Sequence, residues 1–434
     1  MYRRRFTTSG LGLVAAVCWP HDAAAATLLV LLLVPQTHGQ AGLARGVHDP
    51  CIAKEGGSYY VFSTGKGIGI RRSSDLVHWQ WVGHVFDALP TWATRAVPAA
   101  DSLWAPDTSF FNGEYHLYYS VSTFGSNRSC IGLATSKTLD PNSRDYKWQD
   151  HGKVIESKDH DDWNAIDPNI VLDEKNRPWL SFGSFWSGIK MCEIDARTGK
   201  PFPNRPPLIS LAARPKAQAI EAPFVVHHGR HYYLFVSFDH CCRGADSDYK
   251  IMVGRSDKVF GPYAGKNGRP MLQGGGTLAL EGQGRVRGPG HNAVLIEGGK
   301  YWLVHHFYDA QDNGVPYLQI RPLTWDADVW PVEGIALSAH EEKAKSLSRD
   351  QLVGKWRHFV EREPREITLL KSGKINGDDS KATWSIEGIR LTLTWPTKGA
   401  PGGAWVDTCQ VSDDGKHYSG KNQKGARIRG EKFP

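Results

Sequence analysis

The chain has 434 residues, which is long enough for more than one domain. Its formal net charge is +7, but residues 341–434 carry 18 Lys/Arg against 13 Asp/Glu, so they supply +5 and residues 1–340 only +2. Nucleic-acid binding needs a clustered basic face, so the nearly neutral main part argues against nucleic acid as a partner. The 16 Trp exceed what a packed core requires, and exposed Trp faces commonly hold sugars.

Residues 1–40 have the pattern of an export signal. Three arginines at 3–5 precede an apolar run from Ala23 to Val34, and small residues follow from Gly39. The run has 12 residues, whereas a membrane-spanning helix needs roughly 20. We therefore expect a secreted or periplasmic protein with no membrane span in its mature form. The general and twin-arginine export routes both stay open, and the alternative is an uncleaved anchor.

Between residues 48 and 335 the chain alternates short strand-like runs with breaks at Gly, Pro, Asn and Asp. One aromatic strand, preceded by a tight turn, recurs five times: Tyr59–Ser63, Tyr115–Ser120, Trp179–Gly183, Tyr232–Ser237 and Tyr301–His305. Each repeat has room for four antiparallel strands. The pattern predicts an all-β fold, a five-bladed β-propeller over residues 46–337.

A polar residue stands near the start of each repeat, beside Pro or a small residue. These residues are Asp49, Asp107, Asp167, Glu221 and His291, at spacings of 58, 60, 54 and 70. The innermost strand of each blade lines the channel of a propeller, so we expect the five side chains to converge on its axis. A lone Asp–Pro pair is usually a turn, but three acids in phase with a repeat favour a catalytic site.

Three carboxylates at one site suit the hydrolysis of an acetal. One acid protonates the leaving oxygen, and one base activates water. A third carboxylate near the acid raises the pKa of that acid by repulsion between like charges, which keeps it protonated near neutral pH. The sequence therefore predicts a glycoside hydrolase.

The last part of the chain has a different pattern. Residues 338–351 are polar and predict a linker. Short strands follow over 352–434, which predicts a small antiparallel β-barrel or sandwich that serves as an accessory domain. Its opening Gly354-Lys355-Trp356 is similar to the start of lipocalin-like barrels.

The seven cysteines have no spacing that is typical of zinc sites. Cys241 and Cys242 are adjacent, and their sequence leaves a vicinal disulfide and two free thiols as equal alternatives.

The repeats resemble one known family. Its three signature segments are similar to His48–Pro50, Asn164–Pro168 and Ile220–Phe224. Further similar segments are Leu103–Asp107, Ser122–Gly125, Ser184–Trp186, Phe238–Gly244, Tyr249–Ile251 and Gly290–Asn292. In this combination and order, over about residues 46–335, the chain resembles the family 43 glycoside hydrolases, and among them most of all the endo-1,5-α-L-arabinanases.

The resemblance implies a role for each carboxylate. Asp49 would be the general base, Glu221 the general acid, and Asp167 the residue that tunes the pKa of the acid and orients it. The family inverts the anomeric centre, so the base and the acid should be far enough apart to admit a water molecule.

The resemblance also implies a substrate cleft and a metal. Besides Asp49 and Asp167, the positions that match the cleft are Trp104, Phe124, Gly125, Asn164, Ala165, Ile166, Ser184, Phe185 and Trp186. Trp104 and Phe124 would supply stacking faces for arabinose rings. His291 would bind one calcium ion in the channel, with water as the other ligands; the alternative is a histidine that holds a carboxylate in place. His305 and His306 are expected to contact the cleft or the core.

The expected activity is endo-hydrolysis of α-1,5-linked arabinan from plant cell walls, by a protein expected to be a monomer. One alternative is an exo-acting α-L-arabinofuranosidase or β-xylosidase of the same superfamily. Another is a non-catalytic carbohydrate-binding propeller, which the presence of all three acids disfavours. A protein-interaction scaffold is disfavoured further, because it has no use for acids at the axis.

Overall fold

The computed structural model describes residues 44–326, 328–334, 336–337, 347–361, 363–411 and 415–433. The export signal expected at 1–40 lies outside these ranges. None of the helices in the described ranges combines the length and the apolar character that a membrane crossing requires.

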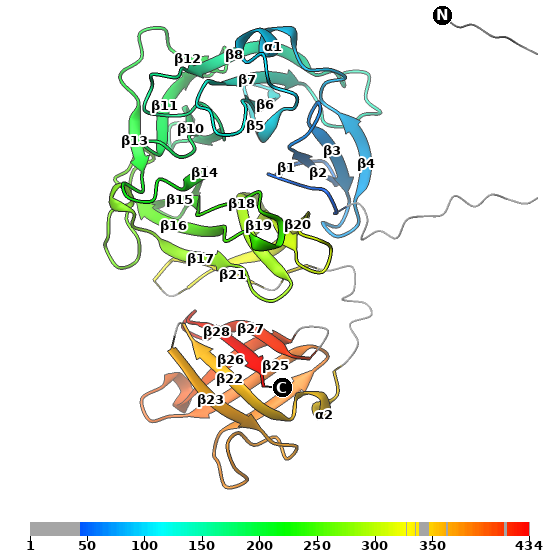
Figure 1. The fold of residues 1–434 in the computed structure, drawn as a ribbon, viewed down its shortest axis with the longest axis vertical. Coiled ribbons are helices and arrows are strands. Elements are labelled where there is room, and N and C mark those ends of the chain that lie inside the picture. The colour runs from blue at the N-terminus through cyan, green and yellow to red at the C-terminus, as the bar shows by residue number, and fades with distance from the viewer. Residues whose placement is uncertain are drawn as a thin grey trace, which may run out of the picture. The chain divides into compact units, whose positions relative to one another are not determined.

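Residues 51–333 form five antiparallel sheets that surround a common centre, so the predicted five-bladed propeller is confirmed (Figure 1). Blade 1 consists of β1 (Cys51–Glu55), β2 (Ser58–Ser63), β3 (Gly69–Ser73) and β4 (Gln80–His84). Blade 2 consists of β5 (Trp104–Phe111), β6 (Glu114–Val121), β7 (Ser129–Ser136) and β8 (Gln149–Ser157). The short helix α1 (Thr91–Ala96) lies between these two blades in the chain.

The other three blades follow the same order from the inside outward. Blade 3 consists of β9 (Asn169–Leu172), β10 (Pro178–Phe182) and β11 (Ile189–Asp195), with β12 (Lys200–Pro201) and β13 (Ile209–Ala212) both pairing with β11. Blade 4 consists of β14 (Ile220–His228), β15 (His231–Phe238), β16 (Lys250–Ser256) and β17 (Thr277–Glu281). Blade 5 consists of β18 (Val286–Glu297), β19 (Lys300–Asp309), β20 (Val315–Trp325) and β21 (Pro331–Glu333). Blade 4 also carries the 3₁₀ turns η2 (Gly244–Asp246) and η3 (Met271–Gln273).

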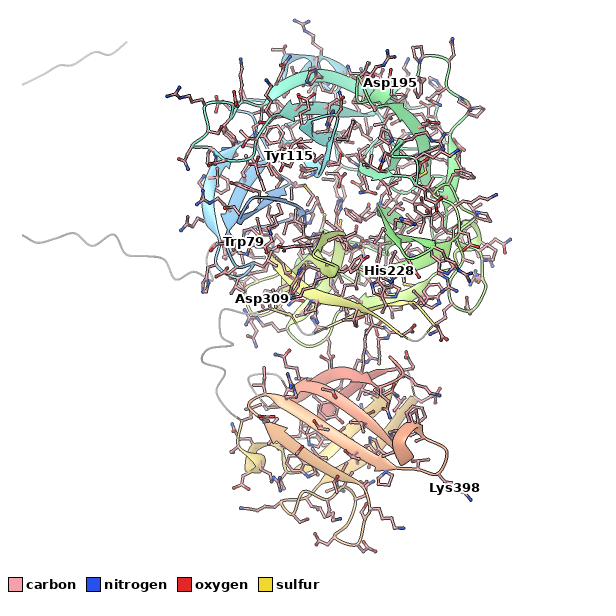
Figure 2. All side chains as sticks on the ribbon, turned by 180° about the vertical axis from the view of Figure 1, so that it is seen from behind. Trp79, Tyr115, Asp195, His228, Asp309 and Lys398 are labelled. Carbon is pink, nitrogen blue, oxygen red and sulfur yellow. The ribbon has the colours of Figure 1, made fainter. Side chains whose placement is uncertain are left out.

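The core of the propeller lies between neighbouring blades. The recurrent aromatic strands supply it, because β6 and β15 are buried along almost their whole length. Trp79 and Tyr115 belong to one cluster that joins blades 1, 2 and 5, and Figure 2 shows the side chains that fill the spaces between the sheets. Such a strand needs apolar side chains on both faces, which is why it reads as a continuous aromatic run and not as an alternating one.

The ring is closed by the residues that precede blade 1. Gly46 donates its backbone N–H to the carbonyl oxygen of Pro316 at 2.8 Å, and Leu318 donates to that of Ala44 at 2.8 Å. These bonds pair residues 44–46 with β20 of blade 5. The last blade therefore contains both ends of the propeller, and this contact places residues 48–50 at the axis.

The C-terminal domain is a separate seven-stranded antiparallel sheet, as predicted. Its strands are β22 (Gly354–Val360), β23 (Glu363–Leu369), β24 (Thr383–Glu387), β25 (Arg390–Pro396), β26 (Ala404–Val411), β27 (His417–Asn422) and β28 (Arg427–Lys432), and the 3₁₀ turn η4 (Pro401–Gly403) precedes β26. Single bridges from Leu369 to Ile375 and from Lys374 to Thr383 connect β23 with β24. The sheet thus closes into a barrel around Trp356.

One boundary differs from the sequence prediction. The helix α2 (Arg349–Leu352) begins with a capping box at Ser348, and Leu347 and Leu352 are buried in the core of the barrel. Residues 347–351 therefore belong to the C-terminal domain and not to the linker expected at 338–351. Residues 338–346 lie outside the described ranges.

Candidate active site

Each blade has a residue with left-handed backbone geometry at or near its innermost strand. These residues are Asp49, Ala105, Asp167, Ala222 and His291, with φ between 47° and 57°. Pro follows four of them, and β5, β14 and β18 are bulged at this point. Residues other than Gly avoid this region of φ, so the repetition marks one structural position that recurs in all five blades.

This position corrects the predicted register of the polar residues. Asp49, Asp167 and His291 occupy the left-handed position, but Asp107 lies two residues after it and Glu221 one residue before it. The sequence placed all five at equivalent points, because a polar side chain beside Pro is visible in a sequence whereas the sign of φ is not. The five side chains consequently do not converge as one set.

The carboxylate of Asp107 has a structural role. It accepts the backbone N–H of Ile170 at 2.9 Å and faces Asn169 of the next blade at 3.4 Å. Burial raises the pKa of Asp107 to about 7, and these hydrogen bonds only partly oppose the shift. Asp107 therefore joins blades 2 and 3.

A ring of hydrogen bonds connects the left-handed residues to the preceding blades. The amide of Ala105 donates to Thr64, that of Asp167 to Ser120, and that of His291 to Ser237, at 2.8–3.0 Å. The amide of Asp49 donates to Nδ1 of His306 at 3.1 Å. In each case the acceptor lies in the last part of the second strand of the neighbouring blade or directly after that strand.

Blade 3 breaks this pattern with Gly183. This residue has no side chain to accept the amide of Ala222, and Asp167 accepts it instead through Oδ2 at 3.1 Å. A Cβ at Gly183 would lie 2.6 Å from the carbonyl oxygen of Gly188, so a larger residue does not fit. Gly183 therefore allows the carboxylate of Asp167 to reach the blade that carries Glu221.

Asp49 lies among imidazoles. His48 Nδ1 lies 2.8 Å from its Oδ2, His291 Nδ1 lies 3.2 Å from its Oδ1, and the hydroxyl of Thr64 donates to Oδ2 at 2.7 Å. Burial alone would raise the pKa of Asp49, but the charge of His48 outweighs burial and holds this pKa below its ordinary value. Asp49 is therefore an ionised acceptor.

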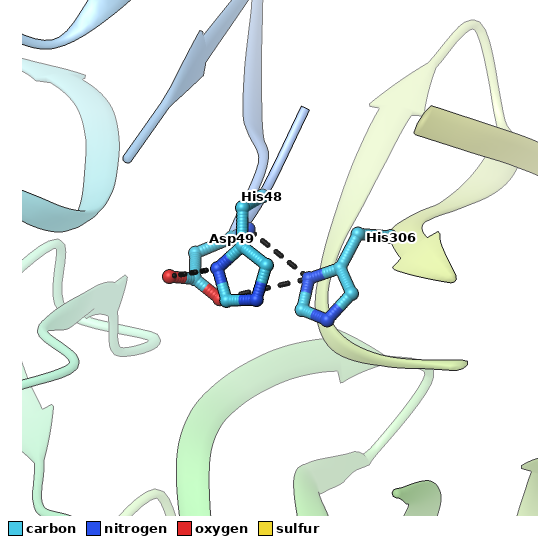
Figure 3. A group of neighbouring side chains, drawn as sticks. All are labelled: His48, Asp49 and His306. Carbon is cyan, nitrogen blue, oxygen red and sulfur yellow. Dashed lines mark hydrogen bonds and ion pairs between the residues drawn. The ribbon is translucent and has the colours of Figure 1, made fainter. Parts of the chain in front are cut away.

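His306 contacts Asp49 from the neighbouring blade 5 (Figure 3). Its Nδ1 accepts the amide of Asp49, so this nitrogen carries no proton, and its ring stacks on that of His48 with centroids 4.1 Å apart. Burial and the neighbouring His48 lower the pKa of His306 far below its usual value. The sequence placed His306 only in the cleft or core. Its partnership with Asp49 crosses from blade 5 to blade 1 and leaves no local signal.

Glu221 lies among hydroxyls. Ser184 donates to its Oε2 at 2.7 Å, and Tyr249 donates to its Oε1 at 2.6 Å. Tyr249 is buried against Gly290, where a Cβ would lie 1.9 Å from its ring. Gly290 thus makes room for the tyrosine that fixes Glu221. Tyr249 was part of a matched segment, but its role could not be read from the sequence.

Asp167 completes the group of carboxylates. It is buried, and burial followed by the charges of Glu221 and Asp49 raises its pKa well above the ordinary value. Burial and the neighbouring negative charges therefore favour the protonated form of Asp167. The site can therefore supply a proton on one side and accept one at Asp49 on the other.

The residues predicted to form the cleft differ in how far their side chains are exposed. Phe124 is 83% exposed, whereas Asn164, Ala165, Ile166 and Ser184 are buried. Trp104, Gly125, Phe185 and Trp186 are the remaining members of the predicted set, of which Gly125, Phe185 and Trp186 have positive φ. Oδ1 of Asn164 is buried and has no hydrogen-bond partner among the described residues.

The donors near His291 do not build a calcium cage. Within the described ranges, one group of three possible ligands comes together, formed by His48, Asp49 and His306. Calcium prefers six to eight oxygen ligands. Here only Asp49 offers oxygen, its two oxygens already contact Thr64, His48 and His291, and Nδ1 of His306 is engaged by an amide. An ion at His291 would take almost all its ligands from water.

Comparisons with known proteins agree with this geometry. The chain is 46% identical over 297 residues to an extracellular exo-α-(1→5)-L-arabinofuranosidase of Cellvibrio japonicus, covering 66% of this chain and 85% of that protein. It is 44% identical over 291 residues to an extracellular endo-α-(1→5)-L-arabinanase of Bacillus subtilis, covering 66% and 87%.

Solved structures extend the comparison. An α-L-arabinanase of Cellvibrio cellulosa in complex with arabinohexaose is 45% identical and covers 66% of this chain and 95% of its own, with a TM-score of 0.64. An endo-1,5-α-L-arabinanase of Thermotoga petrophila covers 90% of this chain and 99% of its own with a TM-score of 0.64, and at 23% identity it shows the fold alone.

The family comparison covers most of the propeller. The model of the glycosyl hydrolases family 43 matches residues 43–331, which is 289 of the 434 residues. This range contains all five blades except the last residues of β21. The chain belongs to glycosyl hydrolase family 43 and is a glycoside hydrolase.

Proposed function

We propose that the protein hydrolyses α-1,5-linked L-arabinan within the chain and inverts the anomeric carbon. The observation that carries this proposal is that two carboxylates of one site have different partners. Asp49 is surrounded by imidazoles, whereas Glu221 accepts hydrogen bonds from hydroxyls. The arabinan-degrading relatives support the choice of substrate.

In the proposed reaction Glu221 protonates the leaving glycosidic oxygen. The hydroxyls of Ser184 and Tyr249 fix the direction of its carboxyl group. Asp167 keeps a proton on the pair by repulsion, and its bond to the amide of Ala222 holds it beside Glu221. A fixed general acid needs no reorganisation when the bond breaks.

Asp49 removes a proton from the attacking water in the same step. Its ionised form is stabilised by His48 and His291, and the bond from its amide to His306 fixes the backbone. Attack from the side opposite Glu221 inverts the anomeric carbon. No protein nucleophile is required.

Phe124 is the proposed outer platform for a pentose ring, because its side chain is 83% exposed on the loop after β6. Trp104, Phe185 and Trp186 are proposed to line the cleft closer to the carboxylates, with Gly125, Asn164, Ala165 and Ile166 shaping its wall. Aromatic faces hold furanose rings without charged partners, which suits a neutral polysaccharide.

Exo-acting hydrolysis is the second candidate, because the Cellvibrio relative at 46% identity is named an exo-arabinofuranosidase. The products from linear arabinan separate the two. We expect an early ladder of arabino-oligosaccharides, and release of one product size from the first minutes would contradict the endo assignment. Xylan and aryl β-xylosides in the same assay test the β-xylosidase alternative.

We also propose export, on the strength of residues 1–40 and of relatives that are named extracellular. Detection of a mature chain that begins near residue 40 in the culture medium or periplasm would support it. Retention of the full-length chain in a membrane fraction would instead indicate an anchor.

Calcium binding at His291 stays a prediction. Because the surrounding side chains offer mostly nitrogen, no step of the proposed reaction uses the ion. If one ion is bound there through water, a chelator should lower the melting temperature and calcium should restore it. The same treatment of His291→Ala should change nothing. Elemental analysis that finds no metal in the untreated protein would assign His291 to the support of Asp49 alone.

A further inference from the structure

The loop between β15 and β16 places two adjacent cysteines beside the carboxylates. The Sγ atoms of Cys241 and Cys242 are 2.8 Å apart, Cys242 is exposed, and its backbone has a φ of 63°. The other described cysteines, Cys51, Cys130, Cys192 and Cys409, are buried. The proposed catalytic mechanism uses neither Cys241 nor Cys242.

A chain of contacts leads from this pair to Asp49. The amide of Cys242 donates to Oη of Tyr308 at 2.8 Å, and Oη lies 2.7 Å from Nε2 of His48. Nδ1 of the same imidazole lies 2.8 Å from Oδ2 of Asp49. Cys242 Sγ is 3.9 Å from both Nε2 of His48 and Oη of Tyr308.

The protonation of this chain is consistent along its length. Burial disfavours a charged His48, but Asp49 outweighs burial and raises the pKa of His48 to about 10, so both ring nitrogens donate. Oη of Tyr308 then accepts from His48 and from the amide of Cys242, and its own hydrogen points at the sulfur. The Cys241 thiol, and then His48, lower the pKa of Cys242 to about 6, which makes this sulfur an anionic acceptor.

We propose that Cys241 and Cys242 form a thiol–disulfide site that controls the position of the general base through Tyr308 and His48. The peptide group that a vicinal disulfide would enclose is the one whose N–H binds Tyr308. Closing the ring changes this peptide and removes the sulfur as an acceptor. His48 and Tyr308 are positioning residues in this proposal.

The chemistry requires an oxidant with a disulfide bond. The Cys242 thiolate attacks one sulfur of the oxidant, forms a mixed disulfide and releases one thiolate. The Cys241 thiol then loses its proton and attacks Cys242 Sγ, which forms the internal disulfide and releases the second thiolate. Two protein thiols are oxidised and one disulfide of the oxidant is reduced to two thiols.

The ring is expected to open again under mild reduction. Consecutive Cα atoms are about 3.8 Å apart, whereas disulfides usually join Cα atoms roughly 4.4–6.8 Å apart. Disulfides forced outside this range are strained, and strained and exposed disulfides belong to the labile and regulatory class. The site would therefore follow the thiol content of its surroundings.

The test compares the full-length enzyme after treatment with oxidised glutathione and after treatment with dithiothreitol. We expect oxidation to remove the mass of two hydrogen atoms, to lower kcat about tenfold with KM within about twofold, and to be reversed by reduction. Absence of the mass change, or a mass change with unaltered kcat, would overturn the proposal. The inference rests on the proposed base Asp49 but not on arabinan, so any pentoside that the enzyme hydrolyses serves as the substrate.

Variants separate coupling through Tyr308 from simple obstruction of the cleft. Cys242→Ser lacks the attacking thiolate and should show no response to oxidation, whereas Cys130→Ala, which removes a buried thiol elsewhere, should respond like the wild type. Tyr308→Phe should still form the disulfide, but its kcat, whatever its starting value, should no longer differ between the two states. A Tyr308→Phe enzyme that keeps the full response would overturn the coupling, because the disulfide would then act directly on the substrate. Melting curves confirm that each variant is folded.

Discussion

The two sides of the site hold their carboxylates with opposite chemistry. On the side of the proposed base, Asp49 contacts His48 and His291, and the charge of His48 favours the ionised form of Asp49. On the side of the proposed acid, Glu221 contacts the neutral hydroxyls of Ser184 and Tyr249, which bind it without a compensating charge. Two carboxylates in one channel can thus have different tasks because of their partners and not because of their depth, since both are buried.

Removal of either carboxylate should have the largest effect. Asp49→Ala and Glu221→Ala should each lower kcat on arabinan by about 10²–10⁴-fold. An aryl arabinoside with an activated leaving group should partly restore Glu221→Ala, because such a group needs no proton, and should not restore Asp49→Ala. Asp145→Ala, an exposed acid far along the chain from both, is the control. If the activated substrate restored kcat equally in both variants, the proposed difference between the base side and the acid side would be contradicted.

The hydroxyl contacts on the acid side should matter next. Tyr249→Phe removes one of two donors to Glu221, and hydrogen bonds to charged groups are worth about 1.5–3 kcal/mol, so we expect kcat to fall about tenfold or more. Thr64→Val on the base side should cost less, because His48 and His291 still hold Asp49. Steady-state kinetics on arabino-oligosaccharides measure both. A larger loss in Thr64→Val would reverse the comparison.

The role of the tuning residue can be tested on the same substrates. Asp167→Asn keeps the size of the side chain but removes its negative charge, and it should lower kcat on arabinan. An activated aryl arabinoside should restore this variant less than it restores Glu221→Ala, because Asp167 also positions the sugar. Full restoration would limit Asp167 to its effect on the proton of Glu221.

Asp107 gives a stability effect that is independent of catalysis. Its pKa in the folded protein, about 7, lies above the value of about 3.9 in an unfolded chain. Its contribution is therefore fully present below about pH 4 and is lost as the pH rises through about 7. Asp107→Asn cannot ionise, so its stability relative to the wild type should increase by on the order of 2 kcal/mol between pH 5 and pH 8. Denaturant unfolding at the two pH values measures this change, and a constant difference would contradict it.

The smallest effect is expected from the C-terminal barrel. A chain that ends after residue 337 keeps every residue of both sides of the site, so its kcat on short oligosaccharides should stay within about twofold of the full chain. A fall on insoluble substrate alone would indicate that the barrel binds polysaccharide. An insoluble or inactive product would instead show that the barrel stabilises the propeller.

Much of this arrangement was visible in the sequence. The five aromatic second strands predicted the five blades, because a strand buried on both faces must be apolar along its length. The carboxylates themselves were found through their proximity to Pro. The sequence did not predict their exact positions in the repeat. Glu221 and Asp107 are offset from the left-handed position, and this offset is visible only in the backbone geometry.

The missed residues share one property. His306, Tyr249 and Tyr308 contact the site from strands or loops far along the chain, at separations set by the closure of the ring. A buried Tyr or His within a strand reads as core, because its partner is not local. The sequence could not distinguish Gly183 from an ordinary strand glycine either, although its missing side chain directs Asp167 toward Ala222.

The left-handed entry residue of each blade has a consequence for how this scaffold can change. Its conformation disfavours any residue other than Gly by roughly 1–2 kcal/mol, whichever side chain is present. Blades 2 and 4 have Ala there, blades 1 and 3 have Asp, and blade 5 has His, while the backbone stays the same. The same backbone conformation therefore accommodates different side chains in different blades. Ala105 and Ala222 are both buried, so a carboxylate or an imidazole introduced at either position would alter the chemistry of the channel only if neighbouring side chains moved to make room for it.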